Sequence, residues 1–143
     1  MGRGRHALPL ARAGFRTFGV DINFDAVRET VHAALDAGTP IVSWCADLTQ
    51  YPLPAAWFDL VVVTRYLQRD LFPSIRATVR QGGIVLYETF TVRQLALGAG
   101  PKSPDHLLRE GELREYFEDF EILFYEETSG APEAVARLVA RRV

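Results

Sequence analysis

The chain has 143 residues, which is long enough for one domain with a hydrophobic core and too short for two. Its 48% hydrophobic and 24% charged residues exclude a disordered chain, and no apolar run is long enough to span a bilayer or to act as a signal sequence. We therefore expect a cytoplasmic protein without a membrane partner, and the formal net charge of −2 disfavours nucleic acid, which usually requires a basic face.

The N-terminal segment is predicted to form a helix followed by a short strand. Residues 5–13 carry small and apolar side chains at helical spacing, and Gly14 is a typical residue at which a helix ends. The run 17–20 then predicts a strand that stops at Asp21. In open α/β sheets ligands bind at the carboxyl ends of strands, so Asp21 is a candidate site residue.

A second helix and a second strand are predicted next. Asn23 or Asp25 can cap the helix, whose apolar positions follow helical spacing. These positions are Val27, Val31, Ala34 and Leu35. Residues 41–46 form a β-rich run that stops at Asp47. Cys45 is the only cysteine, so an intramolecular disulfide and a multi-cysteine metal site are excluded, and we expect no metal.

The middle of the chain is predicted to extend a parallel sheet. Residues 58–63 form an unbroken apolar run, which is typical of a strand that is buried on both faces of such a sheet. A helix over about residues 70–80 leads through Gly82 and Gly83 to a strand over 84–88. Strands that alternate with helices imply a sheet that helices cover on both sides.

The last third is predicted to end in an antiparallel hairpin. A loop over 98–104 precedes a helix at about 110–118, and two strands over 120–128 and 134–142 follow it. The turn signal at 129–132 joins these two strands. We therefore expect an α/β fold of Rossmann-like type, in a single domain over 1–143, with a mostly parallel sheet that finishes in a hairpin.

The segment from Gly2 to Ala7 is a candidate ligand-binding turn. Small residues before a helix allow the backbone to approach a ligand closely, and the helix start offers free N–H groups. The same pattern fits the glycine-rich turn of a nicotinamide- or flavin-binding protein, which requires a strand directly before it. A third interpretation is a disordered terminus rich in arginine and glycine.

Asp21 and Asp47 are candidates for nucleoside binding. A carboxylate after the second strand of a Rossmann-like sheet can accept hydrogen bonds from both hydroxyl groups of a ribose. Asp47 and the backbone N–H that follows it can bind the amino group and a ring nitrogen of adenine. The alternative for Asp21 is a helix-capping role, for which Asn23 and Asp25 are closer to the helix start.

Taken in order, these stretches resemble class I S-adenosylmethionine (SAM)-dependent methyltransferases, and are similar to the small bacterial branch that includes tellurite-resistance-type enzymes. Gly2 and Gly4 match the last two glycines of the family's opening motif, and Gly19-Val20-Asp21 matches its ribose-binding segment. Ala46-Asp47-Leu48 matches the adenine-binding segment, and Phe58-Asp59-Leu60-Val61 matches the fourth strand. Gln81-Gly82-Gly83 resembles the turn before the fifth strand, with glutamine in place of the family's proline.

The resemblance implies SAM as cofactor and a small molecule as methyl acceptor. The residues that it assigns to cofactor binding are Gly2, Gly4, Asp21, Ile22, Asp47, Leu48 and Thr64. Such enzymes need no fixed catalytic residue, because the protein chiefly aligns donor and acceptor. Candidates for a catalytic role are Arg65, Tyr66 and Glu88, with Thr89, His6 and His106 as further options, and the loop 91–109 can cover the acceptor.

One departure from the family concerns its first strand, which lies at the centre of the sheet in the order 3-2-1-4-5-7-6 and has no counterpart in this sequence. Without it the neighbouring strands lie about 10 Å apart with unpaired backbone groups. Three explanations are open for how the unpaired backbone groups are satisfied: a start further upstream, direct pairing of strands two and four, or a partner chain that covers the gap. For the chain as it stands we expect a homodimer.

Two other functions remain open at this point. A nicotinamide-dependent oxidoreductase shares the glycine turn and the ribose-binding acid, but accounts neither for Ala46-Asp47-Leu48 nor for the closing hairpin. A methyltransferase-like domain without the opening motif can instead serve as a non-catalytic binding or assembly module.

Overall fold

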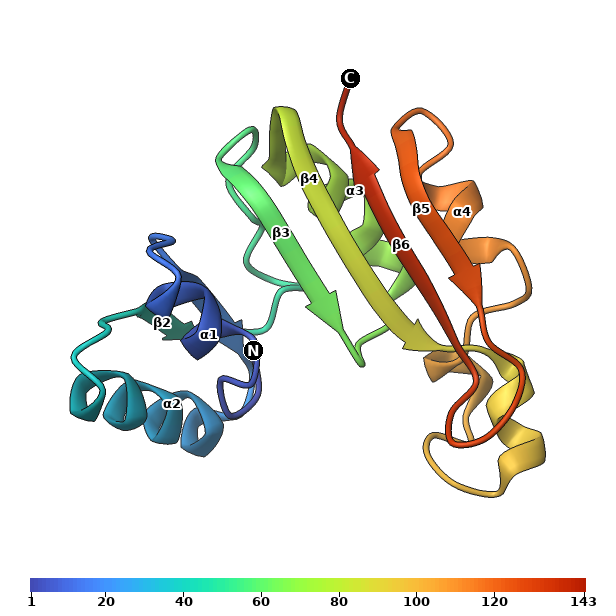
Figure 1. The fold of residues 1–143 in the computed structure, drawn as a ribbon, viewed down its shortest axis with the longest axis horizontal. Helices are drawn as coiled ribbons and strands as arrows, with labels where there is room; N and C mark the ends of the chain where they lie inside the picture. Colours follow the sequence, from blue (N-terminus) through green and yellow to red (C-terminus); the bar gives the residue numbers. More distant parts are fainter. The chain divides into compact units, whose positions relative to one another are not determined.

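Two β-sheets organise the chain in the computed structural model, which describes all residues from 1 to 143 (Figure 1). A two-stranded sheet belongs to Met1–Pro52, which we name the N-terminal unit. A four-stranded sheet belongs to Leu53–Val143, the C-terminal unit. None of the helices is both long enough and apolar enough to cross a membrane.

The N-terminal unit contains two helices and one pair of parallel strands. Its elements are α1 (Ala7–Arg12), β1 (Phe18–Asp21), α2 (Phe24–Asp36) and β2 (Val42–Cys45). Every predicted element of this segment is present, and α1 is shorter than the predicted 5–13. In the parallel register Phe18 lies opposite Val42 and Asp21 opposite Cys45, so both strands end at the same edge.

Helix α2 starts at one of the two predicted caps and buries part of the predicted stripe. The Asn23 side chain accepts a hydrogen bond from the Ala26 N–H at 3.1 Å, which identifies Asn23 as the cap. Val27, Thr30 and Ala34 are buried, whereas Leu35 is 63% exposed. The prediction for Leu35 was wrong because Thr30 packs against the glycine turn, and this turns Leu35 to the solvent side of the helix.

The C-terminal unit contains the larger sheet and several short helices. Its elements are β3 (Phe58–Thr64), η1 (Arg69–Leu71), α3 (Phe72–Thr78), β4 (Val79–Phe90), η2 (Val92–Leu97), η3 (Pro104–His106), α4 (Glu112–Tyr116), β5 (Glu121–Glu127) and β6 (Val135–Arg141), where η denotes a 3-10 helix. The strand order is β3-β4-β6-β5. β3 and β4 are parallel, and β6 is antiparallel to both β4 and β5. The predicted hairpin is thus confirmed, with its last strand inserted next to β4 (Figure 1).

Within the C-terminal unit, helices cover one face of this sheet. α3 contacts β3 and β4, α4 contacts β6, and both lie behind the sheet in Figure 1. Val85 and Tyr87 of β4 are fully buried on that side, whereas Leu86 is 38% exposed. The residues of β3 are mostly half-buried, and within its sheet β3 pairs only with β4.

Strand β4 begins earlier than the glycine pair predicted. Helix α3 ends at Thr78, and β4 starts at Val79. Gly82 and Gly83 lie within the strand at an irregularity, where the pairing with β3 shifts. Gly82 has a φ of +78°, and a Cβ at Gly83 would lie 2.8 Å from the Arg80 carbonyl oxygen. The glycines therefore permit a bulge in the strand instead of ending the helix.

An aromatic cluster forms the core behind the sheet. Phe72, Tyr87 and Phe117 are fully buried, and Phe72 stacks on Tyr116 with ring centroids 3.7 Å apart. The Tyr87 hydroxyl donates to the Tyr66 carbonyl oxygen at 2.9 Å, which satisfies its one polar group. Burial raises the pKa of Tyr87, so this hydroxyl stays protonated as a donor.

An ion pair between the partly exposed Arg69 and the buried Glu112 joins η1 to α4. Glu112 is 1% exposed and accepts from Arg69 Nε at 2.7 Å, from Arg69 Nη2 at 2.9 Å and from the Arg109 N–H at 2.7 Å. Burial raises the pKa of Glu112, but the hydrogen bonds from Arg69 and Arg109 and the charges of both arginines outweigh burial and lower it. Glu112 is therefore ionised in the folded protein at neutral pH.

Replacing Glu112 with glutamine is expected to lower the free energy of unfolding at pH 7 by about 3 kcal/mol, because Arg69 loses its carboxylate partner. The lowered pKa means that the ion pair stabilises the fold above the unfolded-state value of about 4.3, and that this contribution is lost as the pH falls through the folded-state pKa. Urea unfolding of the native chain and of Glu112→Gln, at neutral and acidic pH, measures both effects.

Glu115→Gln is the matched control, because Glu115 lies on the same helix with an exposed side chain and a 3.8 Å contact to Arg109. Its effect should stay within about 0.5 kcal/mol. Equal effects of the two substitutions would contradict the role of the ion pair between Arg69 and Glu112.

Candidate functional site

The carboxyl ends of β1 and β2 bring two predicted site residues to one edge of the N-terminal sheet. Asp21 ends β1 opposite Cys45, and the Ala46 N–H donates to the Asp21 carbonyl oxygen at 3.1 Å. Asp47 follows directly after Ala46. The parallel pairing thus places both aspartates at the edge where open α/β sheets bind ligands.

The Asp21 carboxylate accepts three hydrogen bonds. Its Oδ2 accepts from the Gly2 N–H at 2.6 Å and from the amino group of Met1 at 3.1 Å. Its Oδ1 accepts only from the Asn23 N–H, at 2.9 Å, and so keeps one further acceptor direction. Burial raises the pKa of Asp21, but the N–H groups of Asn23 and Gly2 and the Met1 ammonium outweigh it, and the pKa is lowered.

The predicted glycine turn is packed against helix α2. Gly2 and Gly4 have positive φ angles of 57° and 78°. A Cβ at Gly4 would lie 2.5 Å from Thr30 Cγ2, so only glycine fits this close approach. The Thr30 hydroxyl donates to the Gly2 carbonyl oxygen at 3.0 Å, and the Gly2 N–H donates to Asp21. The turn, α2 and the end of β1 therefore form one hydrogen-bonded assembly.

The segment after β2 has the groups that an adenine ring requires. The Asp47 carboxylate accepts from the Thr49 N–H at 2.9 Å and from Gln50 Nε2 at 3.3 Å, and bonds from Thr49 lower its pKa. The Leu48 N–H makes no hydrogen bond within the chain and is available to a ligand. Ile22 is 70% exposed directly after Asp21 and offers an apolar surface. These groups and the free acceptor direction of Asp21 fit an adenosine moiety.

A pocket of about 570 Å³ lies at the carboxyl ends of β3 and β4, wholly within the C-terminal unit. We name it the β3–β4 pocket. Its lining residues are Arg65, Tyr66, Leu67, Gln68, Arg69, Asp70, Thr89, Phe90, Pro101, Asp105 and His106. Thr64, the last residue of β3, pairs with Glu88 of β4 just before the pocket begins. Its volume suits a drug-sized small molecule.

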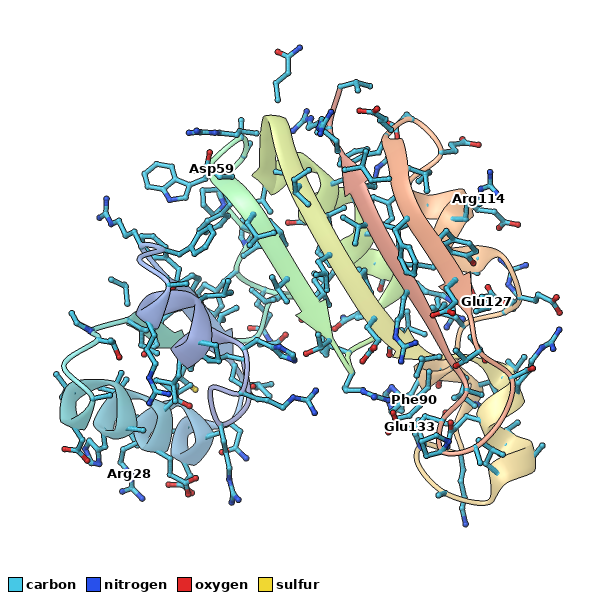
Figure 2. The ribbon with its side chains drawn as sticks, in the orientation of Figure 1. Arg28, Asp59, Phe90, Arg114, Glu127 and Glu133 are labelled. Carbon is cyan, nitrogen blue, oxygen red and sulfur yellow. The ribbon has the colours of Figure 1, made fainter.

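Arg65 is held in an unusual conformation at the pocket wall. Its φ of 55° is rare for a residue other than glycine, and its N–H donates to the Glu88 carbonyl oxygen at 2.8 Å. Its Nη2 lies 2.5 Å from Glu133 and 3.3 Å from Glu88, and its guanidinium lies 4.4 Å from the Phe90 ring centroid. Figure 2 shows Phe90 and Glu133 at the same end of the C-terminal sheet.

The three weak catalytic candidates therefore all have structural partners. Glu88 accepts a hydrogen bond from Arg137 at 2.7 Å and forms an ion pair with Arg65 at 3.3 Å, so two arginines compensate its partial burial. The Tyr66 hydroxyl donates to Gln68 at 2.6 Å, and its carbonyl oxygen accepts from Tyr87. Of the further options, Thr89 and His106 line the pocket, whereas His6 accepts from Arg5 in the N-terminal unit.

The loop 91–109 contributes a fixed wall to the pocket. The buried Gln94 side chain donates to the Ala99 carbonyl oxygen and accepts from the Ala134 N–H at 2.8 Å, which ties the loop to β6. Arg69 Nη2 donates to the Leu107 carbonyl oxygen at 3.0 Å and anchors the other end. Pro101, Asp105 and His106 in the loop line the pocket.

Sequence reasoning missed several residues at this pocket. Phe90 and Arg69 line it and Glu133 holds Arg65, although none was a candidate. Phe90 is the last residue of β4, whereas the predicted strand ended two residues earlier. A prediction that extended the strand to Phe90 would have identified it as a strand-end residue next to the pocket. Glu133 reaches the pocket wall only because β6 inserts next to β4, and no local pattern indicates that contact.

Comparison with known protein families identifies a match to a family described as a methyltransferase domain, over residues 1–83. These residues include every predicted cofactor-binding position as well as Arg65 and Tyr66. No curated protein sequence matches the chain. The match argues against the oxidoreductase alternative, which shares only the glycine turn and the ribose-binding acid.

Solved structures of similar fold cover almost the whole chain. TehB from Haemophilus influenzae has a TM-score of 0.82 at 20% identity, over 99% of this chain and 55% of its own. Magnesium protoporphyrin IX methyltransferase from Synechocystis PCC 6803 with bound SAH has a TM-score of 0.77 at 19% identity, over 99% and 71%. The [4+2]-cyclase SpnF has a TM-score of 0.78 at 18% identity, over 99% and 72%.

These similarities establish the Rossmann-like methyltransferase fold. The chain spans about half the length of TehB, 55%. SpnF has the same fold with a different printed activity, so the fold by itself does not fix the reaction.

The close approach at the glycine turn predicts a large effect for Gly4→Ala. Thr30 cannot move away without losing its hydrogen bond to Gly2, so overpacking should add about 1–3 kcal/mol to the cost of a positive φ. Gly14→Ala is the matched control, because Gly14 has a φ of 90° and nothing within 4 Å of its Cβ position. Urea unfolding should show a clearly larger loss of the free energy of unfolding for Gly4→Ala than for Gly14→Ala. Equal losses would mean that the Thr30 side chain moves aside at little energetic cost.

Proposed function

The chain belongs to the methyltransferase domain family, and from this premise we propose that it transfers the methyl group of SAM to a small-molecule acceptor. One observation carries the proposal: the ends of β1 and β2 offer a carboxylate acceptor, an unpaired N–H and an exposed apolar side chain side by side. This set matches a ribose hydroxyl, a ring nitrogen and the face of an adenine ring.

We assign the nucleoside of SAM to the N-terminal unit. Asp21 Oδ1 would accept a ribose hydroxyl, and the Leu48 N–H with the Asp47 carboxylate would bind the adenine edge. Ile22 would cover a face of the ring, and the turn at Gly2 and Gly4 would allow close approach of the backbone. Thr64 at the end of β3 is the cofactor-binding position proposed in the C-terminal unit.

The acceptor is assigned to the β3–β4 pocket. SAM, when bound, supplies a methyl carbon that is already activated for displacement, so the chain has to orient the acceptor and exclude water. Leu67, Phe90 and Pro101 provide apolar walls for that purpose. Arg65 and Glu88 hold the shape of the pocket through their ion pairs and act as positioning residues.

We further propose that residues 1–143 form one methyltransferase domain. The family match runs from residue 1 to residue 83 and crosses the boundary between the two units at Pro52 and Leu53. Because the matched family domain includes parts of both structural units, the match supports a single domain.

A second candidate function is a methyltransferase-like module without catalysis. The observation in its favour is that backbone N–H groups of the chain, from Gly2 and Asn23, already occupy one acceptor direction on each oxygen of the Asp21 carboxylate, where a ribose with two hydroxyl groups would have to bind. The [4+2]-cyclase has the same fold and a different printed activity, so the fold alone does not establish methyl transfer.

Calorimetric titration of SAM and of its demethylated product into the chain distinguishes the two functions. We expect micromolar binding of both, and a loss of about tenfold or more in Asp21→Asn, because an amide cannot replace both carboxylate oxygens as acceptors. Asp36→Asn is the control, since Asp36 lies exposed at the end of α2. Absence of binding to a folded chain would favour the non-catalytic module.

We also propose that two copies of the chain associate through the free edge of β3. This strand pairs on one side only, and Leu60, Val61, Val62 and Val63 form an apolar run along it. Such an open edge readily adds a further strand. Light scattering should give twice the 16.0 kDa mass of one chain at micromolar concentration. The mass of a single chain over the whole concentration range would overturn this proposal.

A further inference from the structure

The β3–β4 pocket has a charge pattern that restricts its ligand, and we propose that the methyl acceptor is an amine with an apolar body and not an oxyanion. This inference rests on the proposed function and names the acceptor class of the same pocket. It depends on three observations: both arginines of the wall are neutralised, two carboxylates are not, and a histidine is available as a proton acceptor.

The first arginine of the wall, Arg69, is committed to Glu112. Its Nε and Nη2 bind the two carboxylate oxygens at 2.7 and 2.9 Å, and it also donates to the carbonyl oxygens of Asp105 and Leu107. This bidentate pairing uses the fork that would otherwise recognise a carboxylate or another oxyanion. A ligand anion would have to compete with a glutamate that is 1% exposed and fixed by packing.

The second arginine of the wall, Arg65, is committed to two glutamates. Its Nη2 contacts both Glu133 and Glu88, so two negative charges surround one positive charge. Its Nη1 has no hydrogen-bond partner, but this atom is buried and is not exposed to the pocket. Neither arginine therefore offers an oxyanion a free, accessible pair of donors.

The carboxylates of the wall, in contrast, form no ion pair, although the Arg69 guanidinium lies close enough to Asp105 for the two charges to interact. Asp70 and Asp105 line the pocket with exposed side chains, and neither forms an ion pair with any arginine, lysine or histidine. The only hydrogen bond to the Asp105 carboxylate comes from the Ser103 hydroxyl, at 3.4 Å. The accessible charge of the pocket is thus negative, which attracts cations and repels anions.

The rest of the wall consists of apolar or aromatic side chains together with the polar, uncharged Gln68 and Thr89. Leu67 is 6% exposed, and Tyr66, Phe90 and Pro101 line the same space. An apolar body of about the size of a benzene ring buries its surface favourably against such side chains. The combination of apolar walls and unpaired carboxylates selects a molecule with an apolar body and a cationic head, which is an ammonium at neutral pH.

An ammonium needs to lose a proton before its nitrogen can accept a methyl group. His106 lines the pocket, and its side chain forms no ion pair or hydrogen bond within the chain, so its imidazole can take that proton and pass it to solvent. The nitrogen lone pair then forms the new C–N bond while the bond from the methyl carbon to sulfur breaks, and the bonding electrons remain on sulfur. The positive charge ends on the methylated nitrogen.

Binding of benzylamine and benzoate to the chain without cofactor tests the acceptor class, because the two probes share a ring and differ in charge. We expect benzylamine to shift the backbone amide resonances of residues 65–70 and 105–106 in NMR titrations, and benzoate to leave them unchanged. The double substitution Asp70→Asn with Asp105→Asn should weaken benzylamine binding about tenfold. The control Glu118→Gln, at an exposed position outside the pocket, should leave it unchanged.

Three results would each overturn the proposal. They are benzoate binding as tight as that of benzylamine, benzylamine affinity that the double substitution leaves unchanged, and binding of neither probe. Cofactor binding is measured separately by calorimetry, so a chain that binds benzylamine but not SAM would refute the proposed function and leave the charge selectivity of the pocket intact. In a chain that methylates benzylamine, His106→Gln should slow turnover while SAM affinity and benzylamine affinity stay unchanged.

Discussion

Parallel pairing of strands is the constraint on which the candidate sites of this chain depend. In a parallel pair both strands end at the same edge, so whatever follows each strand is brought together there. β1 and β2 place Asp21 beside the segment of Asp47 and Leu48, and β3 and β4 place Thr64 and Arg65 beside Glu88. An antiparallel arrangement would have sent these groups to opposite ends of the sheet.

Charged side chains at and behind the β3–β4 pocket fix the backbone of the C-terminal unit. Arg69 and Glu112 connect η1 to α4, and Arg65 connects the end of β3 to β4 and to Glu133, two residues before β6. Because these charges are neutralised in place, they contribute shape more than electrostatic attraction. The accessible negative charge at the β3–β4 pocket comes instead from Asp70 and Asp105, whose carboxylates form no ion pair.

The comparisons and the physical chemistry of the chain address different questions. The family match and the similar solved structures establish a methyltransferase fold, and the inclusion of a cyclase among them separates that fold from any one reaction. Which donor binds depends on a few backbone and side-chain groups at the strand ends. In our proposal, the class of acceptor depends on how the charges of the β3–β4 pocket are paired.

The sequence by itself determined the order and type of most elements, because hydrophobic spacing, Asn23 as a cap and the turn at 129–132 are local signals. It also indicated Asp21 and Asp47 as strand-end carboxylates. The tertiary structure alone decided which faces are buried and which charges are paired. Leu35 is exposed because Thr30 packs on the glycine turn, and Glu133 holds Arg65 because β6 inserts beside β4. Such contacts join residues far apart in the chain, and no local pattern of side chains encodes them.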